Sequence, residues 1–511
     1  MITAKITTKS FWDNETEAYV FFMKEKLACA SDLQTLSKIE KAYYPHIKDI
    51  LKKHKFEGKK DQFFMVTAPH KNSLIEFIFI GIGEGAKSWN VELETLRRAI
   101  GQLIIELKKK DIKSALLALP EENLYKISRI ELLKQLVITA HMASYEFTTY
   151  RKVPKEKSEW KANVFFEVRS NEEKELSEAL HQGTVIGKAI NQARHWGDMP
   201  PNILTPGLLS SEAEIIAKEQ KLTCTVFGEE KAAQLNMGAF LSVAKGSDHE
   251  GKFVILEYHT KEKNAPTLAL AGKGVTFDTG GISLKPSSGM AGMKYDMSGA
   301  AAVIAIMNII GQLKPNINVI GLTPLVENMP SGKASRQDDV VTAMNGKTIE
   351  IKSTDAEGRL ILSDTLCYAE EFYKPDIIID IATLTGACVY ALGYFYSGLM
   401  TQDAQLQEVL SRIGQLTGDR VWPLPLDDDY KPANKSDVAD VANSGSSIYK
   451  AGTITAACFL QEFVEKSRWA HIDIAGTADS VPGINYLGKG SAGASIRLLV
   501  EFIMSYHRYL A

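Results

Sequence analysis

Short apolar runs alternate with amphipathic helical patterns along most of the chain, and this alternation constrains the fold more than any other feature. In the first 165 residues, the strand-like runs and helical patterns are Phe63–Thr67, Ile75–Ile80, Val91–Lys109, Ser114–Leu119 and Arg129–Ala143. Apolar runs of this length, separated by helices, are typical of a domain in which helices cover the faces of a sheet. This part of the chain therefore predicts an α/β domain.

The alternation resumes after a long helical pattern, Asn171–Trp196, which Gly197 and the Pro200-Pro201 pair should end. Further strand-like runs are Phe253–Glu257, Thr267–Ala271, Val319–Leu322, Ile377–Ile381 and Ala470–Ile474. We expect an α/β protein with two α/β domains joined by a long helix, the C-terminal domain having a mixed central sheet flanked by helices. The expected bounds are 1–165 for the N-terminal domain, 166–196 for the linker helix and 197–511 for the C-terminal domain.

Charge is distributed unevenly along the chain. The formal net charge is only −3, which argues against a surface that binds nucleic acid or anionic membrane throughout. Residues 1–165, however, contain 28 Lys and Arg against 21 Asp and Glu, a balance of +7, so the remainder has a balance of −10. An acidic C-terminal part suits a cation-binding site.

Cysteine usage and the N-terminus indicate the compartment. The cysteines lack a CxxC pair and are scattered at Cys29, Cys224, Cys367, Cys388 and Cys458. A sparse, odd set of this kind is typical of reduced thiols in a cytosolic protein. The N-terminus has no apolar core of a secretory signal, and the most apolar stretches fall well short of the roughly 20 residues that span a bilayer. We expect a cytoplasmic protein without a membrane partner.

Two features of the N-terminal domain leave other functions open. Residues 81–88 read GIGEGAKS, one residue short of a phosphate-binding P-loop, with Ala86 in place of the second glycine. An ordinary turn from strand to helix is the preferred explanation of this segment. Basic clusters at Lys52–Lys60, Lys108–Lys110 and Arg151–Lys157 are compatible with nucleic acid binding, and also with solvated helix ends and loops.

The segment that begins at Ala271 carries the strongest chemical signal. It reads AGKGVTFDTGGISLKPSSGMAGMKYDMSGAAAV and places Lys273, Asp278, Lys285 and Asp296 at or beyond the end of a predicted strand. Ligands bind at strand ends in open α/β sheets, and the glycines here allow close approach of backbone to a bound group. We expect Ser298 to be the N-cap of the apolar helix that follows.

A second cluster, STDAEGRLILSDTL, occupies residues 353–366. Thr354 and Glu357 match a capping box, which is a sufficient structural explanation for that pair but not for Asp355 and Arg359 beside Gly358. The acidic side chains of both clusters supply hard oxygen ligands, enough for two divalent cations that share carboxylates. These are Asp278, Asp296, Asp355 and Glu357.

The segments GKGVTFDTGGISLK and STDAEGRL resemble the two signature regions of the leucyl aminopeptidase (cytosol aminopeptidase) family. Similarity continues through DMPPNILTP, ENMPSGKASR, VVTAMNGKTIEI, IATLTGA and WAHIDIAGTA, and so covers roughly residues 185–505. The chain departs from the family's commonest pattern at Ser353, at Gln337-Asp338 and at Ser298, none of which removes a ligand. The resemblance implies that residues 197–511 form a catalytic metallopeptidase domain.

The resemblance also implies roles for individual residues. The implied metal ligands are Lys273, Asp278, Asp296, Asp355 and Glu357, with Asp278 and Glu357 bridging two ions such as Mn²⁺ or Zn²⁺. Lys285 and Arg359 match the cationic catalytic positions, Lys285 as electrophile and Arg359 as the holder of a bicarbonate that acts as base. The substrate pocket is expected to involve Met293, Thr383, Leu384 and Gly386.

Several expectations about substrates and partners follow from the same resemblance. The substrates are peptides whose N-terminal residue, preferably apolar such as Leu, is removed. A homohexamer is the family's usual assembly. The alternative function does not follow from the resemblance: the +7 balance of residues 1–165 leaves open an additional or sole nucleic-acid-binding role through the basic N-terminal domain.

Overall fold

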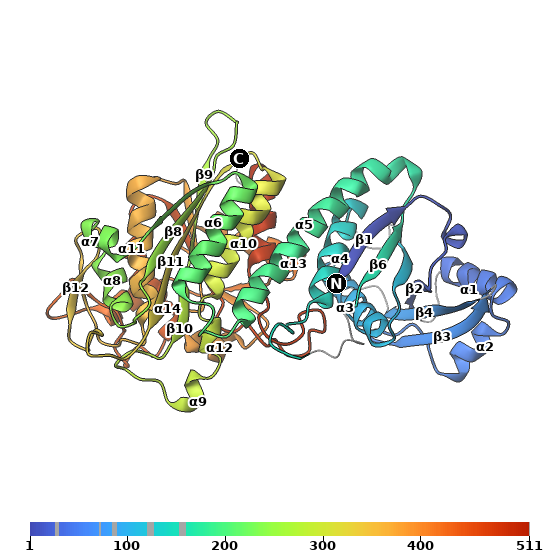
Figure 1. The fold of residues 1–511 in the computed structure, drawn as a ribbon, viewed down its shortest axis with the longest axis horizontal. Coiled ribbons are helices and arrows are strands. Elements are labelled where there is room, and N and C mark those ends of the chain that lie inside the picture. The colour runs from blue at the N-terminus through green and yellow to red at the C-terminus, as the bar shows by residue number, and fades with distance from the viewer. Residues whose placement is uncertain (26–29, 71–72, 84–88, 120–126, 153–159, 510–511) are drawn as a thin grey trace. The chain divides into compact units, whose positions relative to one another are not determined.

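The chain folds into two units, each built around its own β-sheet (Figure 1). The computed structural model describes residues 1–25, 30–70, 73–83, 89–119, 127–152 and 160–509. The first unit comprises Met1–Lys188 with Gly483–Gly488, and the second comprises Ala189–Pro482 with Lys489–Ala511. Their boundary falls within helix α5 (Glu173–Asp198). Two α/β folds with mixed sheets confirm the predicted fold class.

A six-stranded sheet with the order β1-β6-β5-β2-β4-β3 forms the centre of the first unit. Neighbouring strands are parallel except β3 and β4, which are antiparallel. The strands are β1 (Ile2–Thr7), β2 (Ala18–Lys24), β3 (Phe63–His70), β4 (Ser73–Gly83), β5 (Ser114–Ala118) and β6 (Ala162–Glu167).

Helices cover both faces of this sheet. They are α1 (Ala30–Ala42), α2 (Ile47–Lys53), α3 (Trp89–Lys109) and α4 (Arg129–Ser144). Helices α1 and α2 pack through Leu36, Ile39, Ile47 and Leu51 against alternate aromatic residues of β2 and β4. Helices α3 and α4 pack against each other and contact β4 and β1 respectively. The predicted helices and strands of this domain are thus present. Part of the P-loop-like segment, residues 84–88, and part of the third basic cluster, residues 153–157, lie outside the described residues.

A nine-stranded mixed sheet forms the centre of the second unit, with the order β16-β15-β18-β14-β9-β11-β8-β7 and β10 paired to β11. Strands β18, β14, β9, β11 and β10 run parallel, whereas β8 and β15 are antiparallel to their inner neighbours. The strands are β7 (Thr223–Phe227), β8 (Lys252–Tyr258), β9 (Thr267–Gly272), β10 (Gly274–Asp278), β11 (Asn318–Asn328), β14 (Ile377–Ala382), β15 (Ser397–Met400), β16 (Val421–Pro423) and β18 (Arg468–Asp473).

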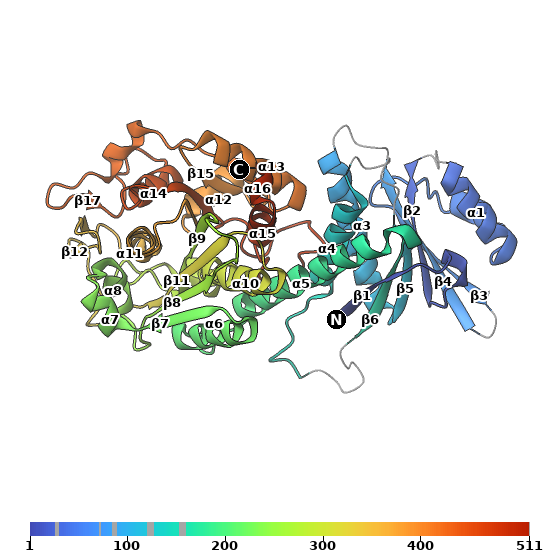
Figure 2. The same ribbon diagram turned by 90° about the horizontal axis from the view of Figure 1, so that it is seen from above.

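Helices lie on both faces of the larger sheet (Figure 2). One group comprises α6 (Pro206–Gln220), α10 (Ser298–Leu313), α13 (Ala404–Thr417) and α15 (Ile496–Met504). The other comprises α8 (Gly238–Ala244), α11 (Glu357–Phe372) and α14 (Gly452–Gln461). Shorter elements are α7 (Glu229–Gln234), α9 (Ser287–Met290), α12 (Gly386–Leu392) and α16 (Tyr506–Tyr509). A small separate sheet has the order β12 (Val340–Thr342), β13 (Thr348–Glu350), β17 (Val441–Ala442).

Helix α10 is apolar on nearly all sides, and the fold accounts for this. It packs on β8, β9, β11 and β14 beneath α6 and α15. Within the described part of the chain, one stretch, Ser287–Leu313, is long and apolar enough to cross a membrane, and 89% of its most apolar window is buried inside the protein. A helix that is hydrophobic all round and buried in this way is a core helix.

Two predicted helix caps are wrong. Helix α10 has Met297 at its N-cap position without a side-chain cap, and the Ser298 hydroxyl instead donates to the Tyr295 carbonyl. Helix α11 begins at Glu357 with Ala356 at its N-cap position, so Thr354 lies two residues too early for a capping box. In both places the polar side chain bonds a neighbouring loop rather than the helix end.

Candidate active site

The carboxyl ends of five strands meet at one edge of the larger sheet and bring the predicted site residues together. Lys273 follows β9 directly, Asp278 ends β10, and the segment from Thr383 follows β14. Strand β11 ends at Asn328 and β18 ends at Asp473. Because the carboxyl ends of parallel strands share an edge, residues far apart in sequence become neighbours there.

Lys273 is the centre of the first group of contacts. Its side chain is 4% exposed, and Nζ lies 2.8 Å from Asp296 Oδ1 and 2.8 Å from Glu357 Oε1. Nζ also donates to the Thr383 carbonyl at 2.8 Å. Three partners fix the ammonium group in place. Gly358 makes this approach possible, since a Cβ there would lie 2.6 Å from Lys273 Cε.

Lys285 is the centre of the second group. Its Nζ lies 2.7 Å from Asp278 Oδ2 and also contacts Asp355 Oδ1. The loop between β10 and Lys285 turns sharply at Gly280 and Gly281, whose φ angles are +85° and +65°. Glycine adopts this left-handed conformation without the steric cost that a Cβ imposes. The turn brings Lys285 back over the end of β10.

Helix α11 supplies Glu357 and Arg359 from its first turn. The positive end of a helix dipole favours a carboxylate there. Arg359 is buried and donates through Nη1 to the Asn443 carbonyl at 2.8 Å. Its Nε has no hydrogen-bond partner among the described residues. Burial lowers the pKa of the Arg359 guanidinium to about 10, although Glu357 and Asp473 partly offset this.

The acidic residues of the site hold more negative charge than the two lysines neutralise. Burial and neighbouring carboxylates raise the pKa of Asp296 and of Glu357 above their usual values, against the lowering effect of Lys273. Burial alone would lower the pKa of each lysine, but the surrounding carboxylates outweigh it and raise the pKa of both Lys273 and Lys285. The electrostatic field of the site therefore favours additional cations.

The donor set fits divalent metal ions. Ligand oxygens of Asp278, Asp355 and Glu357 all lie within 4.8 Å of one another. Asp296 Oδ2 and Glu357 Oε2 are buried and have no hydrogen-bond partner among the described residues. Buried carboxylate oxygens are normally satisfied, and hard divalent cations prefer such oxygens. These two unpartnered carboxylate oxygens are therefore suited to bind a divalent metal ion.

The expected pocket residues lie at two places beside this cluster. Thr383 donates to Asp296 Oδ1 at 2.7 Å, so its segment borders the cluster directly, with Leu384 half-buried and Gly386 at the start of α12. Met293 begins the short turn that leads to Asp296 and is half-buried. Thr383 is therefore in contact with Asp296 and Met293 is close to it in the chain, whereas Leu384 and Gly386 follow Thr383 in the same segment.

Two polar residues support the cluster: sequence reasoning missed Asn328, and it assigned Thr354 only to a capping box. Asn328 Nδ2 donates to Asp278 Oδ1 at 2.8 Å and to the Thr354 carbonyl at 3.0 Å. The Thr354 hydroxyl accepts from Ser283 N at 2.7 Å and donates to the Gly280 carbonyl at 2.6 Å. An asparagine that ends an apolar strand run was the available signal for Asn328.

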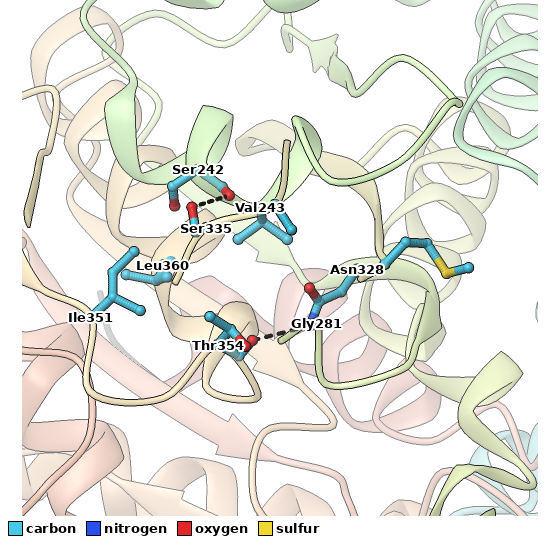
Figure 3. A pocket seen from close by; sticks show the side chains of 10 residues that line it. Ser242, Val243, Gly281, Asn328, Ser335, Ile351, Thr354 and Leu360 are labelled. Atoms are coloured by element: carbon cyan, nitrogen blue, oxygen red, sulfur yellow. Dashed lines mark hydrogen bonds between the residues drawn. The ribbon is translucent and has the colours of Figure 1, made fainter. Parts of the chain in front are cut away.

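Figure 3 shows a small cavity behind these two supporting residues, between Asn328, Thr354 and Ser335. It has room for about one water molecule. The Ser335 hydroxyl donates across it to the Ser242 carbonyl at 2.7 Å. This cavity is too small for a substrate side chain, so it belongs to the support of the site and not to the pocket.

Buried carboxylates and lysines at the carboxyl edge of a mixed sheet are a side-chain set that suits metal-assisted hydrolysis. Residues 191–500 match the family model described as "Cytosol aminopeptidase family, catalytic domain". Residues 20–154 match the model described as "Cytosol aminopeptidase family, N-terminal domain". The chain belongs to the cytosol aminopeptidase family, and it is a metallo-exopeptidase of the aminopeptidase type.

Similar proteins extend over most of the chain. A probable cytosol aminopeptidase of Saccharophagus degradans is 42% identical over 445 residues, 86% of each chain. One of Aquifex aeolicus is 40% identical over 475 residues, 93% of each chain. Among solved structures, the bottromycin maturation enzyme BotP in complex with Mn is 28% identical with a TM-score of 0.83, and the match covers 96% of this chain and 100% of that one.

Proposed function

We propose that the chain is a two-metal aminopeptidase that removes the N-terminal residue, preferably an apolar one such as Leu, from peptides. The observation that carries this proposal is the convergence of Asp278, Asp355 and Glu357, whose ligand oxygens lie within 4.8 Å of one another beside two orphaned buried carboxylate oxygens. With Asp296 and Lys273 these residues make five potential ligands, more than the four that a single tetrahedral site uses.

The residues that would hold two divalent ions, Mn²⁺ or Zn²⁺, are Lys273, Asp278, Asp296, Asp355 and Glu357. Asp278 and Glu357 would serve both ions. Lys273 would bind as the neutral amine, because two adjacent dications would lower the pKa that the carboxylates alone raise. Bound there, the ions would lower the pKa of a water molecule and polarise the scissile carbonyl group. The similar solved structure is described as a complex with Mn, which supports manganese as one native metal.

Lys285 is the proposed electrophile. Its Nζ lies 2.7 Å from Asp278 Oδ2, so its ammonium group is held at the edge of the carboxylate cluster. Burial would lower the pKa of Lys285, but the nearby carboxylates, chiefly Asp278 and Glu357, raise it by more. Lys285 is therefore protonated at neutral pH. A fixed ammonium group can donate a hydrogen bond to the oxyanion that develops as the peptide carbonyl is attacked.

Arg359 is the proposed holder of a small anion, bicarbonate, that accepts a proton during the reaction. Its guanidinium is buried and bonds a backbone carbonyl through Nη1, while Nε is unpaired among the described residues. A planar anion is the partner that a buried guanidinium binds through two parallel hydrogen bonds. No other base is required of the chain in this scheme.

The substrate's α-amine is the feature that we propose defines the reaction. An amine that binds beside the carboxylates must be free, which restricts cleavage to the first residue of a peptide. Met293, Thr383, Leu384 and Gly386 are proposed to surround the first side chain. As further proposals, the chain works in the cytoplasm and assembles as a homohexamer, which light scattering of the purified protein tests.

A second proposed role is nucleic acid binding through the N-terminal part of the chain. It is based on the +7 balance of residues 1–165, in a chain whose net charge is −3. Binding of this kind weakens steeply as salt rises. A DNA titration at two salt concentrations tests it, and binding that is absent at low salt excludes it.

The experiment that tests the aminopeptidase proposal compares leucine anilide with its N-acetylated form at pH 8.5 in the presence of manganese. The free amine should be cleaved, and the acetylated compound should be inert. Because an α-amine titrates near pH 8, kcat/KM should rise with pH through the neutral range. Cleavage of the acetylated compound at about a tenth or more of the rate for the free amine would contradict the proposal.

A further inference from the structure

We infer that Asp473 is a positioning residue of the active site, which fixes the segment Thr383–Gly386 and through it the side chains of Lys273 and Asp296. The inference concerns the aminopeptidase reaction and rests on the proposed function in taking those two residues as metal ligands. Asp473 itself contacts neither of them in the described hydrogen bonds and ion pairs.

The position of Asp473 follows from sheet register. Strands β14 and β18 are parallel, and Asp473, the last residue of β18, pairs with Ala382, the last residue of β14. The chain leaves β14 at this point and enters the segment Thr383–Gly386. Asp473 is fully buried, so its carboxylate lies under the start of that segment rather than in solvent.

The Asp473 carboxylate holds this segment through both oxygens. Oδ1 accepts from Leu384 N at 3.2 Å, and Oδ2 accepts from the Thr385 hydroxyl at 2.7 Å. Oδ1 also accepts from Ala475 N at 3.1 Å, which ties the carboxylate to its own strand end. The Thr385 hydroxyl in turn accepts from Cys388 N at 3.2 Å and caps α12.

The other side of the same segment touches the expected ligands. The Thr383 carbonyl accepts from Lys273 Nζ at 2.8 Å, and the Thr383 hydroxyl donates to Asp296 Oδ1 at 2.7 Å. Asp473 thus bonds one side of the segment Thr383–Gly386, and the two expected ligands bond the other side of the same segment. Outer groups that orient ligands in this way typically contribute about 10–100-fold to metal affinity or activity.

The three groups that donate hydrogen bonds to position 473 explain why a carboxylate is suited to it. The three contacts to Leu384, Thr385 and Ala475 are all donors, so an acceptor-only side chain satisfies them without competition. Asparagine would keep an acceptor for Leu384 N but would present an NH₂ group to Thr385. Alanine would leave the Leu384 amide without this acceptor, and would leave the Thr385 hydroxyl with Thr453 Oγ1 as its remaining side-chain partner.

The test uses the full chain and three variants. Asp473→Ala should lower kcat/KM for leucine anilide by about 10–100-fold, mainly in kcat, and should weaken Mn²⁺ binding to metal-depleted protein by a similar factor. Asp473→Asn should recover part of both losses. Asp364→Asn is the matched control, since Asp364 is equally buried and accepts from Phe240 N and Met344 N at 2.8 Å each, away from the cluster. It should leave both quantities within about twofold at pH 8.

Amide hydrogen exchange supplies a readout that depends on neither activity nor metal. In Asp473→Ala, the amides of Leu384 and Cys388 should exchange at least about tenfold faster than in the parent chain, and Asp364→Asn should leave them unchanged. If Asp473→Ala does not fold, Thr385→Val and Thr385→Ser replace it, because only valine removes the hydroxyl that Asp473 accepts from.

Two results would overturn the inference. One is a folded Asp473→Ala protein with parental kcat/KM and Mn²⁺ affinity, and the other is unchanged exchange at Leu384 and Cys388. Failure of the proposed function has a different signature, namely parent protein that cleaves leucine anilide without metal or does not cleave it at all. In that case the exchange measurement still decides the role of Asp473.

Discussion

Lys273 and Glu357 form a buried ion pair, with 2.8 Å between Nζ and Oε1, and Gly358 is the residue that leaves room for it. A Cβ at position 358 would lie 2.7 Å from Lys273 Cδ and 2.8 Å from Nζ. The lysine cannot retreat without leaving Asp296 and the Thr383 carbonyl. The glycine next to the glutamate is therefore part of the active-site geometry.

Gly358→Ala should for this reason lose activity without losing the fold. We expect kcat/KM to fall by about 100-fold, since displacement of a catalytic group by about 1 Å has effects of that size. Alanine is the better helix former by about 0.5–1 kcal/mol, so the melting temperature should not fall sharply. Gly332→Ala is the control, because nothing lies within 4 Å of a Cβ there. Equal activity of the two variants would contradict the account.

Metal binding and chemistry should separate among the site variants. Asp278→Ala and Glu357→Ala should lose bound metal, because both are expected to serve two ions. Arg359→Ala should keep its metal and lose kcat, since Arg359 is not among the expected ligands and bonds the Asn443 carbonyl. Metal analysis of each purified variant checks this. Normal metal content in Asp278→Ala would show that the shared ligand is assigned wrongly.

Lys285→Ala should lower kcat by about 100-fold or more, as expected for removal of an oxyanion donor. KM should change less, because the interaction is made mainly in the transition state. Steady-state kinetics with leucine anilide distinguish the two constants. A variant that raises KM and leaves kcat unchanged would place Lys285 in substrate binding instead.

Asp364 makes stability depend on pH in a direction that can be measured. Burial raises the pKa of this carboxyl group to about 7, even though backbone amides of Phe240, Met344 and Ala239 lower it in part. The folded chain therefore binds this proton more tightly than the unfolded chain does, so the contribution of Asp364 to stability decreases as pH rises from about 4 to about 7.

Asp364→Asn removes that titration and also replaces one acceptor oxygen. The variant should melt below the parent chain at pH 5, and the difference should shrink by pH 8, where the parent carries a buried charge. Thermal unfolding of both proteins at the two pH values checks this. A difference that is constant, or that widens toward pH 8, would contradict the assigned direction.

The sequence predicted the site well where the evidence was local. Glycine-rich turns and acidic residues at strand ends marked both clusters, and the structure brings Lys273, Asp278, Asp296, Asp355 and Glu357 together as expected. The helix and strand runs were also largely correct, because period and turn residues are properties of short segments. The chemical roles assigned to the five site residues remain predictions that the variants above test.

What the sequence did not reveal depends on sheet register. Asn328 reaches Asp278 because β10 pairs with β11, and Asp473 reaches Leu384 because β18 pairs with β14. No pattern within one segment specifies which strands become neighbours. The wrong cap at Ser298 has a different, local origin, since its hydroxyl donates to the carbonyl of Tyr295, three residues earlier, in a short turn that periodicity does not describe.

The most direct test of the central claim is a titration of metal-depleted protein with Mn²⁺, in which bound metal and hydrolysis of leucine anilide are measured on the same samples. The carboxylate cluster and its orphaned oxygens predict inactive metal-depleted protein and full activity only when two ions are bound per chain. Full activity without metal, or a single ion per chain at saturation, would contradict the two-metal account.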